Sequence, residues 1–214
     1  MQNAQNVKFE ILRMPPENTN SVLVSRDSNC VVFDPWGNFA DWKKLFDARN
    51  IRPVAIYATH GHPDHISAAA RIARQYNIPW FLGTDDFHLI GWGRQILDLF
   101  GIEQMDTSLP PTPMPNGEIT ILDCINMTII KTPGHSAGGV SFWFPDYKIL
   151  LTGDTLFYDG FGRYDLPGGD AGTLKQSIAN LYSMNMAPDT YIVHGHGPDS
   201  TIEKLKQHNP YFVP

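Results

Sequence analysis

The sequence predicts an α+β fold in which two sheets pack face to face between outer helices, a four-layer αββα sandwich. Two observations indicate it. Strand-like segments gather in two runs, one in each half of the chain, and each run is accompanied by helix-like segments. A chain of 214 residues, 42% hydrophobic and 18% charged, can bury a core of that size. We expect residues 1–214 to form a single domain, because no linker or low-complexity tract divides them.

The first half is expected to begin as a meander of short strands. Apolar or alternating runs are separated there by turn-forming residues, and the following segment repeats Phe39, Trp42, Leu45 and Phe46 at helical spacing. A second helix is expected where alanine-rich sequence follows a buried strand. The predicted strands cover residues 7–14, 20–26, 29–33, 53–58 and 78–83, and the predicted helices cover 39–50 and 66–76.

The second half is expected to mirror the first. Residues 85–101 are predicted to be helical despite two glycines, and the proline-rich segment 107–118 is predicted to be a loop without regular structure. Residues 145–147 suit a hairpin turn. The predicted strands cover 118–122, 127–132, 139–144, 148–154 and 190–195, and the predicted helices cover 173–184 and 201–208.

Composition excludes several classes of protein. The net charge of −6 and the absence of a basic block argue against a nucleic-acid partner. No apolar run approaches the roughly 20 residues that a membrane crossing needs, and the N-terminal sequence does not resemble an export signal. We therefore expect a cytoplasmic chain, in which Cys30 and Cys124 are reduced packing residues.

The segment THGHPDH, residues 59–65, crowds metal-binding side chains between a predicted strand and a predicted helix. Imidazoles and carboxylates are the side chains that bind a borderline divalent metal. His60 and His62 lie two apart, so in extended backbone they project to the same side, whereas Asp64 and His65 enter the helix. This loop could therefore serve two neighbouring metals, about 3.5–4 Å apart and able to hold a bridging hydroxide.

Further candidate ligands stand at other strand ends. His135 lies in TPGHSAGG, where Pro133 and Gly134 favour a tight turn, and Asp154 ends the apolar segment KILLTGD. His196 ends TYIVHGH, and His194 is a conceivable substitute because it lies on the same side of an extended strand.

In this order, H-x-H-x-D-H, a glycine-flanked histidine, TGD and GHG resemble the metallo-β-lactamase superfamily. The resemblance implies a metallo-β-lactamase-like αββα fold and a centre of two divalent ions. It also places Asp34, in VVFDPWGN, as a carboxylate near the site. By resemblance, His60, His62 and His135 would hold one metal, Asp64, His65 and His196 the second, and Asp154 would bridge both.

Within the superfamily, TGDTLFYDGFGRYDLPGGD is most similar to glyoxalase II, hydroxyacylglutathione hydrolase, and its shorter bacterial relatives. By this resemblance, Arg163 would clamp the glycine carboxylate of glutathione, since guanidinium pairs bidentately with carboxylate, and Tyr164 would compensate for a tyrosine donor that glyoxalase II has at the position of Asp165. Secreted β-lactamases are disfavoured by the lack of an export signal and by Asp154, where several of them carry cysteine. Large basic nucleases are disfavoured by the short acidic chain, and His62 disfavours flavodiiron proteins, which have glutamate there.

Three departures weaken a strict assignment to glyoxalase II. Asp165 stands where that enzyme has a tyrosine, and Gly197 and Pro198 replace its Glu-Tyr pair. Only 214 − 196 = 18 residues follow His196, so we expect the helical domain that supplies further basic contacts to glutathione to be absent. We therefore expect a thioesterase with looser or different recognition of a small-molecule thioester, glutathione-linked ones included.

The expected mechanism uses a metal-bridging hydroxide that attacks the thioester carbonyl while Asp64 and Asp154 orient it. A thiolate leaves without a dedicated acid because the pKa of a thiol is only about 8.5. Zinc is the metal that we favour, and iron or manganese would suit the same donors.

Two alternatives remain open on the sequence. One is an iron-dependent persulfide dioxygenase, in which His60, His135 and Asp154 would form a two-histidine, one-carboxylate site; GHGP favours hydrolysis because that family usually reads AHDY. The other is a non-catalytic metal-binding module, which the retention of all seven ligand positions argues against. The sequence leaves the oligomeric state open.

Overall fold

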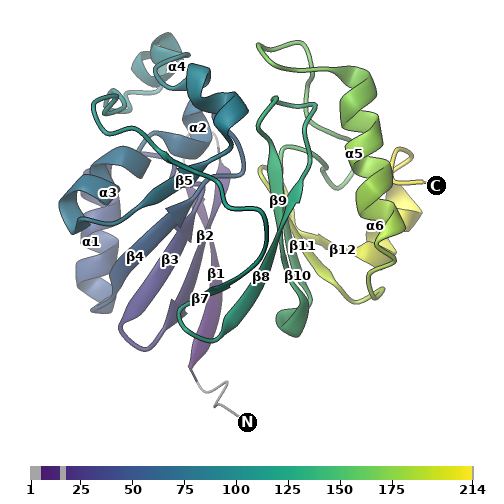
Figure 1. The fold of residues 1–214 in the computed structure, drawn as a ribbon, viewed down its shortest axis with the longest axis horizontal. Helices are drawn as coiled ribbons and strands as arrows, with labels where there is room; N and C mark the ends of the chain where they lie inside the picture. Colours follow the sequence, from purple (N-terminus) through teal and green to yellow (C-terminus); the bar gives the residue numbers. More distant parts are fainter. Residues whose placement is uncertain (1–5, 15–17, 214) are drawn as a thin grey trace.

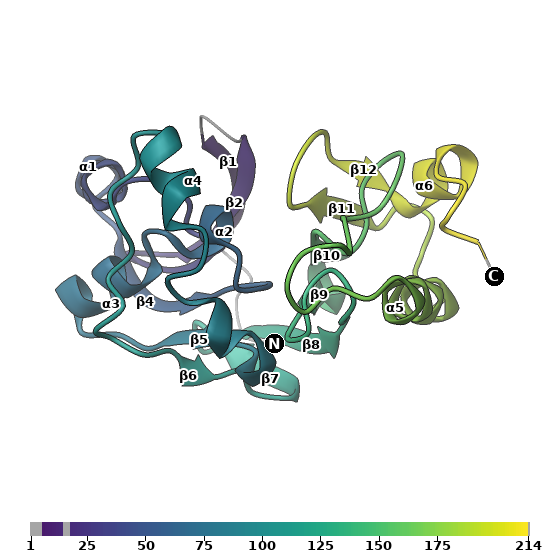
Figure 2. The ribbon, with the colours of Figure 1, turned by 90° about the horizontal axis from the view of Figure 1, so that it is seen from above.

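Two six-stranded sheets lie face to face, with helices on their outer surfaces (Figures 1 and 2). The computed structural model describes residues 6–14 and 18–213. The strand order is β1-β2-β3-β4-β5-β6 in the first sheet and β12-β11-β10-β9-β8-β7 in the second. The predicted αββα sandwich is therefore confirmed.

The first sheet starts as an antiparallel meander and continues with parallel strands. Helices α1 and α3 cover its outer face, and the short helices α2 and α4 lie at one end of the sheet (Figure 1). Its strands are β1 (Val7–Met14), β2 (Thr19–Arg26), β3 (Asn29–Phe33), β4 (Arg52–Tyr57), β5 (Trp80–Leu82) and β6 (Thr112–Pro113). Its helices are α1 (Phe39–Arg49), α2 (Pro63–Ile66), α3 (Ala69–Tyr76), the 3₁₀ helix η1 (Thr84–Leu89) and α4 (Arg94–Leu99).

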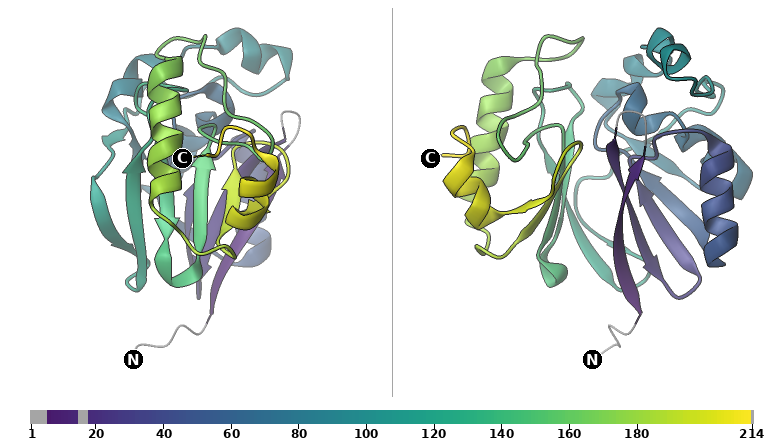
Figure 3. Two further views of the ribbon diagram at one scale, coloured as in Figure 1. Left: turned by 90° about the vertical axis from the view of Figure 1, so that its right-hand side faces the viewer. Right: turned by 180° about the vertical axis from the view of Figure 1, so that it is seen from behind.

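The second sheet is an antiparallel run to which β11 adds a parallel strand beside β10. Helices α5 and α6 cover its outer face (Figure 3). Its strands are β7 (Gly117–Ile121), β8 (Ile125–Lys131), β9 (Val140–Phe144), β10 (Ile149–Gly153), β11 (Tyr191–His194) and β12 (Ser200–Thr201). The 3₁₀ turn η2 (Pro145–Tyr147) joins β9 to β10, as predicted, and the helices are α5 (Ala171–Ser183) and α6 (Ile202–His208).

Strand β3 shows how one short sequence stabilises two cores. Val31 and Phe33 face the second sheet, whereas Cys30 and Val32 face the helices, because successive side chains leave opposite sides of a strand. Phe33 packs edge-on against Phe142 of β9, with ring centroids 5.0 Å apart. Both faces of the first sheet are therefore buried. Cys30 is buried and reduced, as expected, whereas Cys124 is reduced but only partly buried.

Three segments differ from their sequence-based predictions. The helix expected over 66–76 begins only at Ala69, because Pro63 starts a separate short helix, α2, that ends at Ile66. Residues 85–101 do not form one helix, since Gly91 and Gly93 adopt positive φ between η1 and α4. The loop expected over 107–118 contains β6, which pairs with β5 at the sheet edge, where a proline is tolerated.

Several chain reversals meet along one edge where the two sheets adjoin. The loop after β4, the loop from β8 to β9, and the segments after β10 and β11 all contribute to it. In the part of the chain that the structure describes, no helix is both long and apolar enough to span a membrane.

Candidate metal centre

The shared sheet edge brings together all seven predicted ligands. His60 follows β4, and His62 is the N-cap of α2, whose first turn carries Asp64 and His65. Pro63 at the first helical position turns the chain there without losing a backbone hydrogen bond. The remaining three come from the second sheet: His135 between β8 and β9, Asp154 after β10 and His196 after β11.

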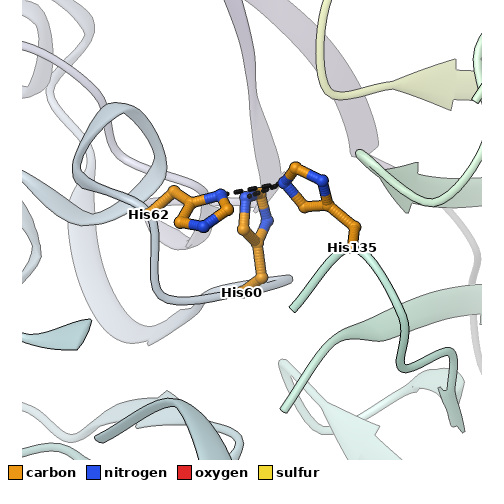
Figure 4. A group of neighbouring side chains, drawn as sticks. All are labelled: His60, His62 and His135. Carbon is orange, nitrogen blue, oxygen red and sulfur yellow. Dashed lines mark hydrogen bonds between the residues drawn. The ribbon is translucent and has the colours of Figure 1, made fainter. Parts of the chain in front are cut away.

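Three buried histidines form a first group, His60, His62 and His135, and their rings point toward one another (Figure 4). His135 Nε2 lies 2.8 Å from His62 Nδ1 and 3.2 Å from His60 Nε2. His135 Nδ1 donates to the Arg163 carbonyl over 2.6 Å, so its Nε2 faces the others as a lone pair. A single proton cannot bond to all three converging nitrogens at once, whereas a metal cation can.

A second group consists of Asp64, His65 and His196. Asp64 Oδ2 lies 3.0 Å from His196 Nε2 and 3.5 Å from His65 Nε2, and the two histidine Nε2 atoms are 3.4 Å apart. His65 is fully buried, but the side chains of His196 and Asp64 are 27% and 20% exposed. The second group therefore forms the solvent-facing side of the centre.

Asp154 lies between the two groups. Its Oδ2 is 3.5 Å from His135 Nε2 and 3.6 Å from His196 Nε2, and its Oδ1 is 3.4 Å from His65 Nε2. Oδ1 is buried and has no hydrogen-bond partner among the described residues. A buried carboxylate oxygen without a donor is costly, and a metal ion would supply the missing partner. The donor set thus fits two divalent cations.

The electrostatics of the first group favour neutral ligands. Burial, with the neighbouring His65, His62 and His135, holds the pKa of His60 well below its ordinary value. Burial and then His135 lower the pKa of His62 to about 4. Both imidazoles are therefore unprotonated at neutral pH, which is the form that binds a metal.

In the second group, neighbouring carboxylates favour the protonated form of the histidine instead. Burial alone would lower the pKa of His65, but Asp64, Asp34 and Asp154 raise it well above the ordinary value. Burial opposes ionisation of Asp154, yet His65 holds the pKa of that carboxyl below its usual range. Three carboxylates around one imidazole therefore create a position that attracts positive charge.

Asp34 fixes which nitrogens face the centre. Its carboxylate accepts from the Thr59 backbone N–H at 2.6 Å, from Thr59 Oγ1 at 2.8 Å and from His65 Nδ1 at 3.0 Å. Because Thr59 Oγ1 donates to Asp34, it accepts from His60 Nδ1 at 3.0 Å. Asp34 therefore directs the Nε2 atoms of both His60 and His65 toward the candidate ligand positions. The sequence placed Asp34 near the site, but it gave no indication of the relay through Thr59.

Gly195 is required by the close packing of the centre. A Cβ atom at this position would collide with Asp154 Oδ1 and would lie 2.9 Å from His65 Cε1. Only glycine allows the backbone after β11 to pass this close to the carboxylate. The first glycine of the GHG segment is thus part of the geometry of the centre.

Arg163 and Tyr164 lie on the segment that follows Asp154. The Arg163 guanidinium forms a bidentate ion pair with Asp165, at 2.7 and 2.8 Å, and its side chain is 61% exposed. Its backbone carbonyl, rather than its side chain, contacts His135. Tyr164 is exposed and lines an apolar pocket with Phe161. Their predicted contacts with substrate stay predictions.

His194 does not join either group. It is buried, and its Nδ1 donates to the Leu156 carbonyl at 2.5 Å. Burial lowers the pKa of His194 to about 4, against the effect of that hydrogen bond. Asn20, which the sequence did not single out, donates to the carbonyls of His194 and Gly197 and so supports the loop that carries His196.

Comparison with known proteins identifies the family. The family model described as the metallo-β-lactamase superfamily matches residues 14–196. The chain belongs to the metallo-β-lactamase superfamily. It is 32% identical to the probable metallo-hydrolase YqgX of Bacillus subtilis (strain 168) over 208 residues, covering 94% of this chain and 96% of the relative. It is also 32% identical to the hydroxyacylglutathione hydrolase GloC of Haemophilus influenzae over 210 residues, covering 96% and 98%.

Solved structures of the superfamily share the fold. The B3 metallo-β-lactamase BLEG-1 is similar at a TM-score of 0.85 and 30% identity, covering 97% of this chain and 100% of that one. TTHA1623, crystallised in a di-iron-bound form, is similar at a TM-score of 0.83 and 30% identity, covering 94% and 99%. This chain is therefore a metallo-hydrolase of the superfamily, with a candidate metal-binding cluster of histidines and aspartates.

Proposed function

We propose that this chain is a thioester hydrolase similar to glyoxalase II, acting on small-molecule thioesters that include glutathione-linked ones. The observation that carries the proposal is the convergence of seven donors, three in each of two groups and Asp154 between them. The likeness to GloC, which extends over nearly the whole of both chains, supports the choice of substrate class. Since glutathione is the thiol of the cytosol, we also propose a cytoplasmic location.

His60, His62 and His135 would hold one divalent ion, and Asp64, His65 and His196 the other, with Asp154 in reach of both. Two such ions supply Lewis-acid polarisation of a carbonyl oxygen and lower the pKa of a water to near 7. Zinc suits these nitrogen and oxygen donors, and iron and manganese suit them as well; the similar protein TTHA1623 was crystallised in a di-iron-bound form.

The chain's own residues then define the direction of approach. Substrate would enter over Asp64 and His196, the exposed side of the centre, while the buried first group lies behind them. The Asp64 and Asp154 carboxylates would orient the attacking water. A thiolate leaving group needs no protonating side chain, since the pKa of a thiol is only about 8.5.

Arg163 would bind the carboxylate of a glutathione-linked substrate if it exchanges its partner Asp165 for the ligand. Its exposed ion pair is weak enough for such an exchange. Arg163→Ala should then raise KM for S-lactoylglutathione and leave kcat nearly unchanged. The matched control, Lys175→Ala, removes another cation from the same part of the surface and should not change KM. An unchanged KM in Arg163→Ala would show that Arg163 does not bind the glutathione part of the substrate.

The proposed activity is tested by supplying purified chain, loaded separately with zinc, iron or manganese, with S-lactoylglutathione. We expect thiol release that is lost in Asp154→Ala. A chromogenic β-lactam and glutathione persulfide with an oxygen electrode serve as comparison substrates. Preferential turnover of the β-lactam, or oxygen uptake on the persulfide with one iron per chain, would contradict a thioesterase. Equal background rates for wild type and Asp154→Ala on every substrate would indicate a non-catalytic module.

A further inference from the structure

Asp86 is a fully buried carboxylate in η1 that the mechanism above does not use. Its side chain is 0% exposed. Its Oδ1 accepts from the Gly138 backbone N–H at 2.6 Å, and its Oδ2 accepts from the Gly61 backbone N–H at 2.9 Å and from Ser136 Oγ at 2.7 Å. A buried carboxylate with three donors is tightly fixed, because each charge-assisted bond restrains its orientation.

The three donors belong to two different loops. Gly61 lies between His60 and His62, on the loop after β4 of the first sheet. Ser136 directly follows His135, on the loop between β8 and β9 of the second sheet. One side chain thus ties together the two loops that carry all three histidines of the first group. Among the described residues, all three hydrogen bonds of the Asp86 side chain are made to these two loops.

Glycine at positions 61 and 138 makes this contact possible. A Cβ atom at Gly138 would lie 2.8 Å from Asp86 Cγ, and one at Gly61 would lie 3.0 Å from Asp86 Cβ. Larger residues would force the loops away from the carboxylate. The glycines therefore give independent evidence that Asp86 is embedded between the two loops.

We propose that Asp86 is the positioning residue of the first metal group: it sets the separation of His60 and His62 from His135 by binding the backbone beside each. The inference rests on the proposed metal centre. Loss of an outer partner of this kind typically weakens metal binding about 10–100-fold. The second group should weaken much less, because Asp64 and His65 lie in α2, beyond Pro63, and the hydrogen bonds of the Asp86 side chain are made to Gly61 and to the loop after β8.

Asp86→Asn tests the proposal at nearly constant size. An amide presents one NH₂ group, which must face either the Gly138 N–H or the Gly61 N–H, and neither backbone donor can reverse. At least one of the two loops is therefore released. Asp85→Asn is the matched control, since it makes the same charge change one residue earlier in η1 at an exposed side chain.

The measurement is zinc affinity by competition with a chromogenic chelator on the full chain. A His196→Ala background isolates the first group, and a His62→Ala background isolates the second. We expect Asp86→Asn to weaken zinc binding about 10–100-fold in the first background and less than twofold in the second. Asp85→Asn should change neither affinity.

Equal zinc affinities for Asp86→Asn and Asp85→Asn would overturn the proposal, and so would equal weakening in both backgrounds, which would indicate a general effect on the fold. If the His196→Ala parent binds no zinc, the proposed metal centre fails rather than the role of Asp86. If Asp86→Asn does not fold by circular dichroism, Ser136→Ala replaces it. That variant removes one of the three donors without burying an opposed amide, and it should weaken only the first group.

Discussion

Asp34→Asn is the substitution that should most specifically disturb the orientation of the ligands. Asp34 has a φ of 50°, a left-handed conformation that asparagine also adopts, so the backbone is not strained by the change. The new NH₂ group cannot face the Thr59 backbone N–H, which lies 2.6 Å from Oδ1. It must therefore take the place of Oδ2, opposite Thr59 Oγ1 and His65 Nδ1.

That orientation changes the tautomer of the neutral, metal-binding form of His65. In that form, His65 Nδ1 would have to accept a hydrogen bond from the new amide, so the single ring proton would lie on Nε2, the atom facing Asp64, Asp154 and His196 at 3.4–3.5 Å. Zinc could then bind His65 Nε2 only by displacing its proton, or by moving that proton to Nδ1, where it would face the new amide NH₂ group. A loss of about 10–100-fold in affinity at the second group, or roughly 1.4–2.7 kcal/mol, is expected. The first group should weaken as well, because Thr59 passes the change to His60.

Chelator competition on the full chain measures both zinc affinities. Asp27→Asn is the matched control, because Asp27 is also left-handed, with a φ of 53°, but is exposed and distant from the ligands. Circular dichroism and thermal unfolding establish that each variant folds. If Asp34→Asn binds both zinc ions within twofold of the control, Asp34 does not direct the ligand nitrogens.

Two further predictions concern the segment around β11. His194→Asn keeps a donor to the Leu156 carbonyl but removes the titration. The pKa of His194 is about 4 in the folded chain against an ordinary 6.5, so the wild type should lose about 3 kcal/mol of its free energy of unfolding from this group as pH falls from 6.5 to 4. Denaturant unfolding across that range should show a shallower pH dependence of stability in the variant than in the wild type. Gly195→Ala should displace the Asp154 carboxylate and reduce the bound metal, measured by elemental analysis, and full metal content in this variant would contradict the packing argument.

The sequence predicts most of the architecture because hydrophobic periodicity is read locally. Apart from β6 and β12, which were not predicted, the strands of both sheets lie close to their predicted ranges, as do helices α1, α5 and α6. Hydrophobic periodicity gives the wrong prediction for the segment 85–101. Its apolar residues are compatible with a helix, but Gly91 and Gly93 break it, and only the fold decides that η1 must present Asp86 inward.

The candidate ligands are predictable for a different reason. Four of them stand in one short segment, and the other three end strands or occupy a glycine-rich turn, so residue type and order are informative. The residues that orient these ligands are not predictable, because their partners are distant in sequence. Asp34 reaches His65 across 31 residues, and Asp86 reaches Ser136 across 50. An aspartate in a turn or a short helix gives no local sign of such a role.

Anomalous diffraction from a crystal of the zinc-loaded chain would locate the metal ions themselves. We expect two anomalous peaks, one bounded by His60, His62 and His135 and the other by Asp64, His65 and His196, with the Asp154 carboxylate between them. A single peak, or a peak away from these side chains, would contradict the proposed metal centre.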